Sequence, residues 1–447
     1  MKKYNNYKDS DVEWIGKIPS HWIMQRIDWV SKIVRGNTAF KKDELLDAGE
    51  YIALQYGKTY KVDVVDDSFN FYVNSEFFNE SQVTTKGDTI LISTSETVED
   101  LGHTCFYNNQ NVGLLGGEQI LLKPNRKFLH EKYLYHYSRQ FGSELRRYAR
   151  GLKVFRFNTS DLKQLFIAIP TLEEQISIAN YLDHKTSQID HLIAKKEQFI
   201  KLLEEERVAV INQAVTKGLN PNVTMKDSGV EWLGKIPEHW ERARIKTLVA
   251  IKVCDGPHET PEWKEEGIPF ISAEAIKGNQ IDLNYKRGFI SEEQHLEYCK
   301  KSKVQKGDIL FCKSGSTTGK SALVENDDEF GIWSPLAIIR VNEKKISNRF
   351  MFQSIQSSLF KNQVETSWTF GTQPNIGMGA LENLWIAIPP LNEQVLIDEY
   401  LRTEITKFEN IILKTFQEVD LLKEYKIALI SEVVTGKVDV STSSTQV

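Results

Sequence analysis

One octapeptide carries the residue types of a phosphate-binding loop. Residues 314–321 read SGSTTGKS and follow an expected strand. A nucleotide-binding loop needs the spacing GxxxxGK[ST], because its backbone amides must wrap the phosphates before the lysine reaches them. Ser314 stands where the first glycine belongs, and a loop counted from Gly315 is one residue short. The spacing therefore argues against nucleotide hydrolysis by this chain.

A second constellation could serve a metal-dependent nuclease. The segment CDGPHETPEWKEEG contains Asp255, Glu262 and Lys264. Metal-assisted phosphodiester cleavage needs carboxylates that are held on adjacent strands. This segment is rich in Pro, Gly and charge, so we expect a solvated loop. The four cysteines show no CxxC spacing and are expected to be reduced thiols rather than zinc ligands.

A basic stretch offers chemistry of another kind. Residues 126–156 contain nine Lys or Arg against two Glu, in a chain whose net charge is −5. Aromatic residues interleave with these cations, a composition that suits nucleic acid. A solvated amphipathic helix with core aromatics explains the aromatic residues better, but it does not explain the loop that follows. The residues that we predict to contact DNA in this loop are Arg146, Arg147, Arg150, Lys153, Arg156 and Asn158.

A corresponding loop in the second half has a different composition. Residues 367–375 read SWTFGTQPN and carry no cation. Gln and Asn can make bidentate contacts to adenine, whereas Arg favours guanine, so the two loops would read different bases. The predicted DNA contacts of the second half are Lys313, Ser316, Lys320, Thr372, Gln373 and Asn375.

These loops belong to an internal repeat. Residues 9–22 read DSDVEWIGKIPSHW, and residues 227–240 read DSGVEWLGKIPEHW, with differences at three positions. The strands TILIS and ILFCKS, and the segments FIAIP and WIAIP, follow at nearly the same offset. His21 and His239 fall in this box, but its Pro and Trp indicate an edge strand that docks a Trp into a core. The chain is therefore a duplication.

Each copy of the repeat ends in a long helical pattern. From Leu172 to Lys217 no Pro or Gly interrupts the chain, and Gly218 and Pro221 then stop the helix. Apolar residues recur at steps of three and four, which is a heptad seam. The seam residues are Ile189, Ile193, Ile200, Leu203, Val210 and Ala214, with Lys196 and Arg207 as polar interruptions.

The second pattern, residues 391–436, repeats the register of the first at an offset of 219. Its polar positions Thr415 and Lys426 fall on Lys196 and Arg207. Since an Ile/Leu/Val stripe is unstable in water, we predict that the two seams pack on each other, antiparallel. The seam residues here are Ile405, Phe408, Ile412, Val419, Leu422, Leu429 and Val433.

The predicted fold class is α/β (α+β), with a pseudo-two-fold internal repeat. Two β-rich mixed domains are separated by two long helices that form an antiparallel coiled coil. Helical spacing is also expected over residues 128–149 and 349–364, and a strand over residues 51–58. The predicted segments are a first globular domain (1–170), a central helix (171–222), a second globular domain (223–389), a C-terminal helix (390–438) and a disordered tail (439–447).

Composition excludes several classes of protein. With 40% hydrophobic and 26% charged residues, the chain has the balance of a globular protein. No apolar run is long enough to cross a bilayer, and the N-terminal residues lack the apolar core of a signal peptide. We therefore expect a cytoplasmic location. A net charge of −5 argues against a uniformly basic coat but allows a local basic face.

Taken in order, these marks resemble the DNA-specificity subunit of type I restriction-modification systems over essentially the whole chain. The marks are the VEWLGKIPEHW box, the KGDIL strand followed by SGSTTGK, the loop at residues 371–375 and the PPLNEQ opening of the second long helix. The first half departs from the pattern with SETVE at residues 95–99 and with PTLEEQ. These departures affect single contact residues rather than the resemblance.

The resemblance implies a division of labour. Each domain would be a target recognition domain that reads one half of a split DNA site, and the helices would set the spacing and dock two methyltransferase subunits. Restriction subunits would join the complex. The chain would be non-catalytic and hold no cofactor or metal, while S-adenosylmethionine, ATP and Mg would belong to the partners. The predicted docking residues are Glu174, Gln175, Glu393 and Gln394.

Two rival functions remain open at this point. A stand-alone nuclease would act through the Asp255 constellation and would cleave DNA in the presence of a metal ion. A coiled-coil scaffold without DNA contact would show no salt-dependent binding to duplex, whereas phosphate contacts make affinity fall steeply as salt rises.

Overall fold

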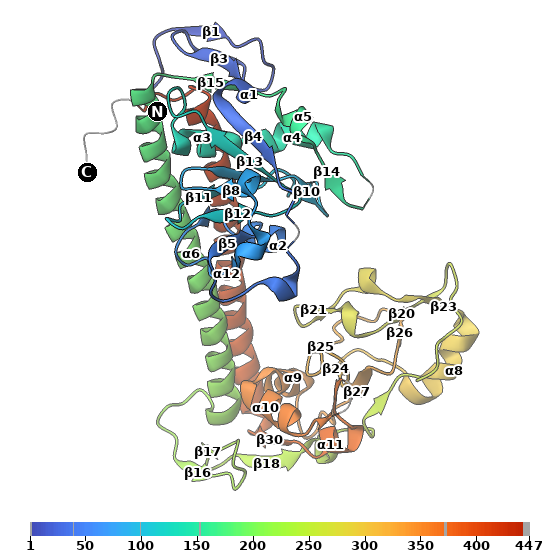
Figure 1. The fold of residues 1–447 in the computed structure, drawn as a ribbon. Coiled ribbons are helices and arrows are strands. Elements are labelled where there is room, and N and C mark those ends of the chain that lie inside the picture. The colour runs from blue at the N-terminus through green and yellow to red at the C-terminus, as the bar shows by residue number, and fades with distance from the viewer. Residues whose placement is uncertain (1, 39, 99, 152, 371–372, 441–447) are drawn as a thin grey trace. The chain divides into compact units, whose positions relative to one another are not determined.

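The computed structural model describes residues 2–38, 40–98, 100–151, 153–370 and 373–440 (Figure 1). Its residues group into two units. Unit 1 combines Met1–Lys195 with Glu418–Val447, and unit 2 is Lys196–Gln417. Both boundaries fall inside the long helices, so each unit contains a part of each helix. This grouping differs from the five predicted segments, in which the helices stand apart from the recognition domains.

The two long helices are α6 (Leu172–Lys217) and α12 (Leu391–Val434). They begin and end close to the predicted positions. Gly218 follows α6 with a φ of +73°, the left-handed conformation in which glycine often ends a helix. The stop signals in the sequence therefore work as expected.

Within each unit the two helices run antiparallel, as predicted. In unit 1 the beginning of α6, with Ile178 and Leu182, shares a core with Leu429 and Val433 near the end of α12. In unit 2 the helices are antiparallel as well, and here the end of α6 packs against the beginning of α12. The core residues that establish this are Ile211, Ala214 and Val215 of α6 and Ile397 and Leu401 of α12.

The heptad seam is confirmed by burial. Every predicted apolar seam position is buried or half-buried, while most residues between these positions are exposed. The polar interruptions also have structural roles. Lys426 forms an ion pair with Asp190 of α6 at 2.7 Å, and the Thr415 hydroxyl donates to the carbonyl of Ile411 at 2.8 Å. The interruptions therefore keep their polar groups satisfied inside the helix pair.

Unit 1 carries a five-stranded sheet of order β4-β13-β9-β11-β6 and a four-stranded sheet of order β7-β5-β12-β8. Most neighbours are antiparallel; β6–β11 and β5–β12 are parallel. The elements are β1 (Tyr7–Asp9), β2 (Lys17–Pro19), β3 (Ile23–Arg26), α1 (Ile27–Val30), β4 (Ser31–Arg35), β5 (Tyr51–Leu54), α2 (Tyr56–Thr59), β6 (Val64–Val65), β7 (Tyr72–Val73), β8 (Val83–Thr84), β9 (Thr89–Ile92), β10 (Thr94–Ser95), β11 (Thr104–Tyr107), β12 (Gly113–Leu115), β13 (Gln119–Pro124), α3 (Glu131–Ser138), α4 (Phe141–Leu145), β14 (Phe155–Arg156), α5 (Thr159–Leu162) and β15 (Phe166–Ile169).

Unit 2 repeats this arrangement with a four-stranded sheet, β19-β27-β24-β25, and a three-stranded sheet, β23-β20-β26. The elements are β16 (Met225–Asp227), β17 (Lys235–Pro237), β18 (Glu241–Arg244), α7 (Ile245–Leu248), β19 (Cys254–Asp255), β20 (Ile268–Ile271), β21 (Ile276–Lys277), β22 (Gln280–Ile281), β23 (Gly288–Ile290), α8 (Glu292–Ser302), β24 (Ile309–Cys312), β25 (Ser321–Leu323), β26 (Gly331–Ile332), β27 (Leu336–Ile339), α9 (Asn348–Gln356), α10 (Ser358–Thr366), β28 (Thr369–Phe370), β29 (Pro374–Asn375), α11 (Met378–Glu382) and β30 (Trp385–Ile388).

Alternation along the central strands explains why both sheet faces are covered. In β13, Ile120 and Leu122 enter the core shared with the long helices, whereas Leu121 enters the core beneath the second sheet. In β24, Ile309 and Leu310 divide in the same way between two cores. Because successive side chains of a strand point to opposite faces, a continuous apolar run signals a sheet buried on both sides.

Several sequence predictions need correction. The strand expected over residues 51–58 ends at Leu54, and α2 follows it. The helix expected over 128–149 is divided into α3 and α4, and the one over 349–364 into α9 and α10. The second division falls at Ser357, whose backbone is extended and whose hydroxyl accepts from the amide of Phe360, so that it caps α10. Asp439 and Val440, which were assigned to the tail, are buried against unit 1; residues 441–447 lie outside the described residues.

A histidine ties α3 to α6 in unit 1. Nε2 of His136 lies 2.8 Å from Oδ1 of Asp183, which Lys132 also contacts. Burial lowers the pKa of His136, although Asp183 acts in the opposite direction. Nδ1 is buried and has no hydrogen-bond partner among the described residues. A second proton would therefore be stranded there, so the folded state favours the neutral ring.

This histidine predicts a pH effect on the stability of unit 1. A depressed folded pKa stabilises the protein above the unfolded pKa of about 6.5, and this contribution is lost as pH falls. Gln353 of α9 is the residue of unit 2 that corresponds to His136. The substitution His136→Gln should make the free energy of unfolding less dependent on pH between about 7.5 and about 5.5. Urea unfolding of both proteins at these pH values measures the difference; parallel losses of stability would contradict the prediction.

Candidate nucleic-acid interface

The start of each long helix is joined to the repeated box by a glutamate. In unit 1, Glu174 accepts hydrogen bonds from Nε2 of His21 at 3.0 Å and from the indole of Trp22 at 3.4 Å. In unit 2, Glu393 makes the equivalent contacts with His239 and Trp240 at 2.9 and 3.1 Å. Both Trp rings are fully buried. The predicted docking of the Trp into a core is therefore confirmed, and the histidines belong to this junction.

A buried glutamine completes each junction. Oε1 of Gln175 accepts from the amide of His130 at 2.7 Å, and Nε2 donates to the carbonyls of Phe128 and Pro170 at 2.9 and 3.0 Å. Gln394 repeats the pattern in unit 2. It accepts from the amide of Ser347 at 2.7 Å and donates to the carbonyl of Pro389 at 2.9 Å. Each glutamine thus connects a helix start to its own recognition domain.

These contacts change the interpretation of the predicted docking residues. The side chains of Gln175 and Gln394 are fully buried, and their amide groups are satisfied inside the unit. Partner docking by these two glutamines stays a prediction. Glu174 and Glu393 are half-buried and bond to the box. Partner docking by these two glutamates stays a prediction.

In unit 1 the basic loop pairs with the segment that follows β9. Strand β14 lies antiparallel to β10, with Thr94 opposite Arg156. The loop closes on itself, because the backbones of Arg150 and Arg156 exchange two hydrogen bonds of 3.0 Å. The side chains of all five predicted cations, Arg146, Arg147, Arg150, Lys153 and Arg156, are exposed.

Carboxylates position part of this loop. Arg147 lies 3.2 Å from Glu144, and Arg150 lies 3.3 Å from the buried Asp161. Asn158 precedes α5, and its backbone amide donates to the carboxylate of the same Asp161 at 2.8 Å. The structure therefore brings the predicted residues together at one surface, with Asn158 half-buried at its inner edge.

The remainder of the basic stretch is structural. Arg126 pairs with Glu131, and Arg139 is held by Asp63. Burial works to raise the pKa of Asp63, but Arg139 and Lys426 outweigh it and the pKa is lowered, so this carboxyl stays ionised. The aromatic residues belong to the core, as their spacing indicated; those buried are Tyr133, Tyr135, Tyr137, Phe141 and Phe157.

In unit 2 the two predicted loops also meet. The amide of Gly315 donates to the carbonyl of Pro374 at 3.0 Å, and the amide of Ile376 donates to the carbonyl of Lys313 at 2.9 Å. Ser314 and Asn375 form an isolated antiparallel bridge. Exposed beside this pairing are Ser316, Lys320, Gln373 and Asn375, whereas Thr372 lies outside the described residues.

The SGSTTGKS loop does not have the shape of a nucleotide-binding loop. The amide of Gly319 donates to the carbonyl of Cys312 at 2.8 Å, and the amide of Thr318 donates to that of Gly315 at 3.1 Å. These amides are thus used inside the loop rather than left for phosphate. Strand β25 follows, where a phosphate loop would continue into a helix.

The three residues of the nuclease hypothesis do not form a metal site either. The loop expected over their segment is wrong for Asp255, which lies in a strand. Asp255 lies in β19, which pairs with β27, and its side chain is fully buried. Glu262 is exposed and pairs with Lys264. In the described part of the chain, no group of three His, Cys, Asp or Glu side chains could hold a metal ion.

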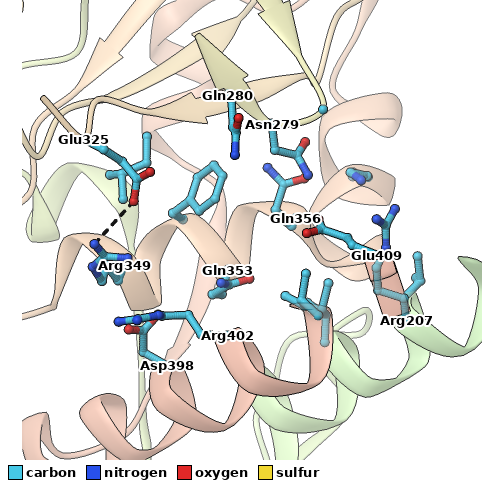
Figure 2. A pocket seen from close by; sticks show the side chains of 17 residues that line it. Arg207, Asn279, Gln280, Glu325, Arg349, Gln353, Gln356, Asp398, Arg402 and Glu409 are labelled. Atoms are coloured by element: carbon cyan, nitrogen blue, oxygen red, sulfur yellow. Dashed lines mark ion pairs between the residues drawn. The ribbon is translucent and has the colours of Figure 1, made fainter. Parts of the chain in front are cut away.

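Unit 2 also contains a polar cavity of about 250 Å³ that no sequence pattern indicated (Figure 2). Helices α9 and α12 and the turn between β21 and β22 line it. Arg349 pairs with Glu325 at 3.3 Å, and Oδ1 of Asp398 has no hydrogen-bond partner among the described residues. Burial raises the pKa of Asp398. Since cations and carboxylates both line the cavity, its wall selects no particular charge of ligand.

Comparison with known proteins gives the family. The model of the type I restriction modification DNA specificity domain matches twice, at residues 19–202 and 237–418. The chain therefore belongs to this family, and its function is DNA sequence specificity. The two matches coincide with the two copies of the internal repeat. Neither rival function receives support.

Individual relatives agree with this assignment. The type I restriction enzyme MjaVIII specificity subunit of Methanocaldococcus jannaschii is 23% identical, over 95% of this chain and 94% of the relative. The EcoBI specificity subunit of Escherichia coli is 27% identical over 59% of this chain and 56% of its own length.

Solved structures share the fold. A chain from a type I restriction-modification system aligns with a TM-score of 0.68 and 16% identity, covering 94% of this chain and 99% of that chain. The HsdS subunit of Thermoanaerobacter tengcongensis aligns with a TM-score of 0.52, again at 16% identity, over 94% and 98% of the two chains. Within the described residues, no helix is long and apolar enough to span a membrane.

The buried glutamines give a prediction for stability. Gln175→Ala leaves an amide and two carbonyls without partners, which should cost about 3 kcal/mol of unit 1 stability. Equilibrium urea unfolding of the full chain measures this cost. Gln188→Ala, at an exposed position of the same helix, is the matched control and should change stability by less than about 0.5 kcal/mol. Equal effects of the two substitutions would show that the junction contributes nothing.

Proposed function

We propose that each unit reads one half of a split DNA site through its paired loops. One observation carries the proposal. Two loops at corresponding places of the repeated frame pair with each other in both units, through β10 and β14 in unit 1 and through Ser314 and Asn375 in unit 2. A shared frame that presents different exposed side chains is what two readers of different sequences require.

The chemistry of the loops indicates how the two halves differ. In unit 1 the exposed Arg and Lys side chains suit phosphate oxygens and the O6 and N7 acceptors of guanine. In unit 2 the exposed amides of Gln373 and Asn375 suit the N6 and N7 groups of adenine. We infer that unit 1 contributes more of the electrostatic affinity of the loops.

Catalysis would reside in partner subunits. Two methyltransferase subunits would supply S-adenosylmethionine and methylate adenine, and restriction subunits would supply ATP- and Mg-dependent cleavage, in the cytoplasm. Exposed apolar side chains on α12 support docking of a partner protein there, because such side chains in water mark contact surfaces. Examples are Leu413, Phe416 and Ile427, which are 57%, 50% and 66% exposed.

Modularity is the first test of this proposal. Exchanging residues 23–165 for the same region of a relative should change one half of the recognised site and leave the other unchanged. The modified motif in DNA methylated by the assembled complex, read by methylation-sensitive sequencing, gives both halves directly. A change in both halves would contradict the assignment of one reader to each unit.

The basic loop provides the second test. Lys153→Ala should weaken binding to all duplexes and reduce the slope of log affinity against log salt by about one, if Lys153 holds phosphate. If it reads guanine instead, discrimination at one position should fall by about 1–3 kcal/mol. Lys127→Ala, an exposed lysine outside the loop, is the control. Binding that is unaffected by alanine at all five loop cations would remove the loop from the interface.

A further inference from the structure

A buried carboxylate in unit 2 gathers three cationic side chains. Nζ of Lys301 lies 2.7 Å from Oδ1 of Asp255. Nζ of Lys313 and Nε2 of His258 lie 3.2 and 3.1 Å from Oδ2. The Asp255 side chain is only 1% exposed, whereas those of Lys301 and His258 are 56% and 69% exposed. The cluster therefore has a buried anionic centre and a cationic surface.

The charges do not balance. Burial works to raise the pKa of Asp255, but the ammonium groups of Lys301 and Lys313 outweigh it, and the pKa is lowered. The carboxyl thus carries one negative charge against two permanent positive charges, with His258 adding a third when protonated. A buried carboxylate needs a partner to be tolerated, but a second and third cation exceed that need. The Lys301 and His258 side chains carry this charge to solvent, whereas the Lys313 side chain is only 12% exposed.

The backbone fixes the cluster beside the recognition loops. Lys313 directly follows β24; its amide donates to the carbonyl of Pro335 at 2.8 Å, and its carbonyl accepts from Ile376 of the second loop. The segment with His258 is held by a separate hydrogen bond, in which the backbone amide of Ser334 donates to the carbonyl of Pro257 at 3.1 Å. Lys301 comes from α8. Three separate elements therefore converge on one carboxylate at the edge of the paired loops.

Unit 1 has no such carboxylate at the corresponding position. In unit 1, Gly36 follows β4, which pairs with β13, and the residue before it is Arg35. In unit 2, Gly256 follows β19, which pairs with β27, and the residue before it is Asp255. Arg35 is exposed. Unit 1 has five exposed cations in its basic loop, whereas the second loop of unit 2 offers amides. In the described part of its paired loops, unit 2 exposes one cation, Lys320. Since duplex affinity depends on neutralised phosphates, unit 2 needs further cations from another source.

We propose that Lys301, Lys313 and His258 form a binding site for a DNA backbone phosphate, and that Asp255 is the positioning residue that holds them. This inference rests on the proposed function. Each ammonium has three N–H donors, and Lys301 donates one of them to Oδ1 of Asp255 at 2.7 Å, so its other donors remain for phosphate oxygens. The site contributes affinity and fixes the register of unit 2 on the duplex, without reading a base.

Lysine substitutions test the phosphate contact. The full chain, assembled with its methyltransferase partner, is titrated with a duplex that carries the methylated motif, over a series of salt concentrations. Lys301→Ala should reduce the slope of log affinity against log salt by about 0.9 and leave sequence preference unchanged. Lys300→Ala is the matched control, because Lys300 is the preceding residue of α8, is exposed and pairs with Glu297 outside the cluster.

Substituting Asp255 tests the positioning role. Asp255→Asn removes a negative charge, so charge alone predicts tighter binding to DNA, whereas loss of positioning predicts binding several-fold weaker. In the Asp255→Asn background, the further effect of Lys301→Ala should also shrink. Tighter binding by the Asp255→Asn variant, or an undiminished effect of Lys301→Ala, would overturn the role of Asp255. Because Lys301 is exposed, its substitution tests the site even if Asp255→Asn unfolds unit 2.

The outcomes separate this inference from the proposed function. Equal salt slopes for Lys301→Ala and Lys300→Ala would overturn the phosphate site. If Lys153→Ala in unit 1 still reduced the slope in that case, the reading of DNA by paired loops would stand. If neither Lys301→Ala nor alanine at any of the five loop cations of unit 1 altered binding, the proposed reading of DNA by the paired loops would fail.

Discussion

The structure depends on how the first turn of each long helix is fixed to a recognition domain. A glutamate that accepts from an indole and an imidazole lies next to a glutamine that is buried among backbone groups, and the pair occurs once in each unit. Breaking such buried hydrogen bonds is costly because the stranded groups find no water. The orientation of each recognition domain on its own helix segments is thereby determined at the residue where the helix begins.

The two units show how one frame can carry two binding chemistries. Their central sheets have the same alternation of core residues, and their loops pair at the same place. The choice of residue at a core position is constrained by the volume available for packing, whereas a loop only has to connect the elements on either side of it. Unit 1 exposes five cations in its basic loop, whereas unit 2 gathers two lysines and a histidine around Asp255 of the edge strand β19. Equivalent affinity can therefore arise from different parts of the frame.

Much of this was predictable from sequence, for identifiable reasons. The helices, their register and the repeat follow from periodicity. The segment at residues 371–375 and the basic loop of unit 1 were recognisable as loops from their composition. Residues 371 and 372 lie outside the described residues. Asp255 was missed because its strand has two residues in a window rich in Pro and Gly, and its partners Lys301 and Lys313 lie far along the chain. The burial of Gln175 could not be predicted, because surface and buried glutamines look alike in a sequence.

Unit 2 is continuous in sequence, whereas unit 1 contains both ends of the chain. The core of unit 1 includes Leu429, Val433 and Val438, which follow the whole of unit 2 in the sequence. The recognition domain that is synthesised first therefore remains without part of its core until the whole of unit 2 has been synthesised. The domain synthesised second can thus complete its core before the first one does.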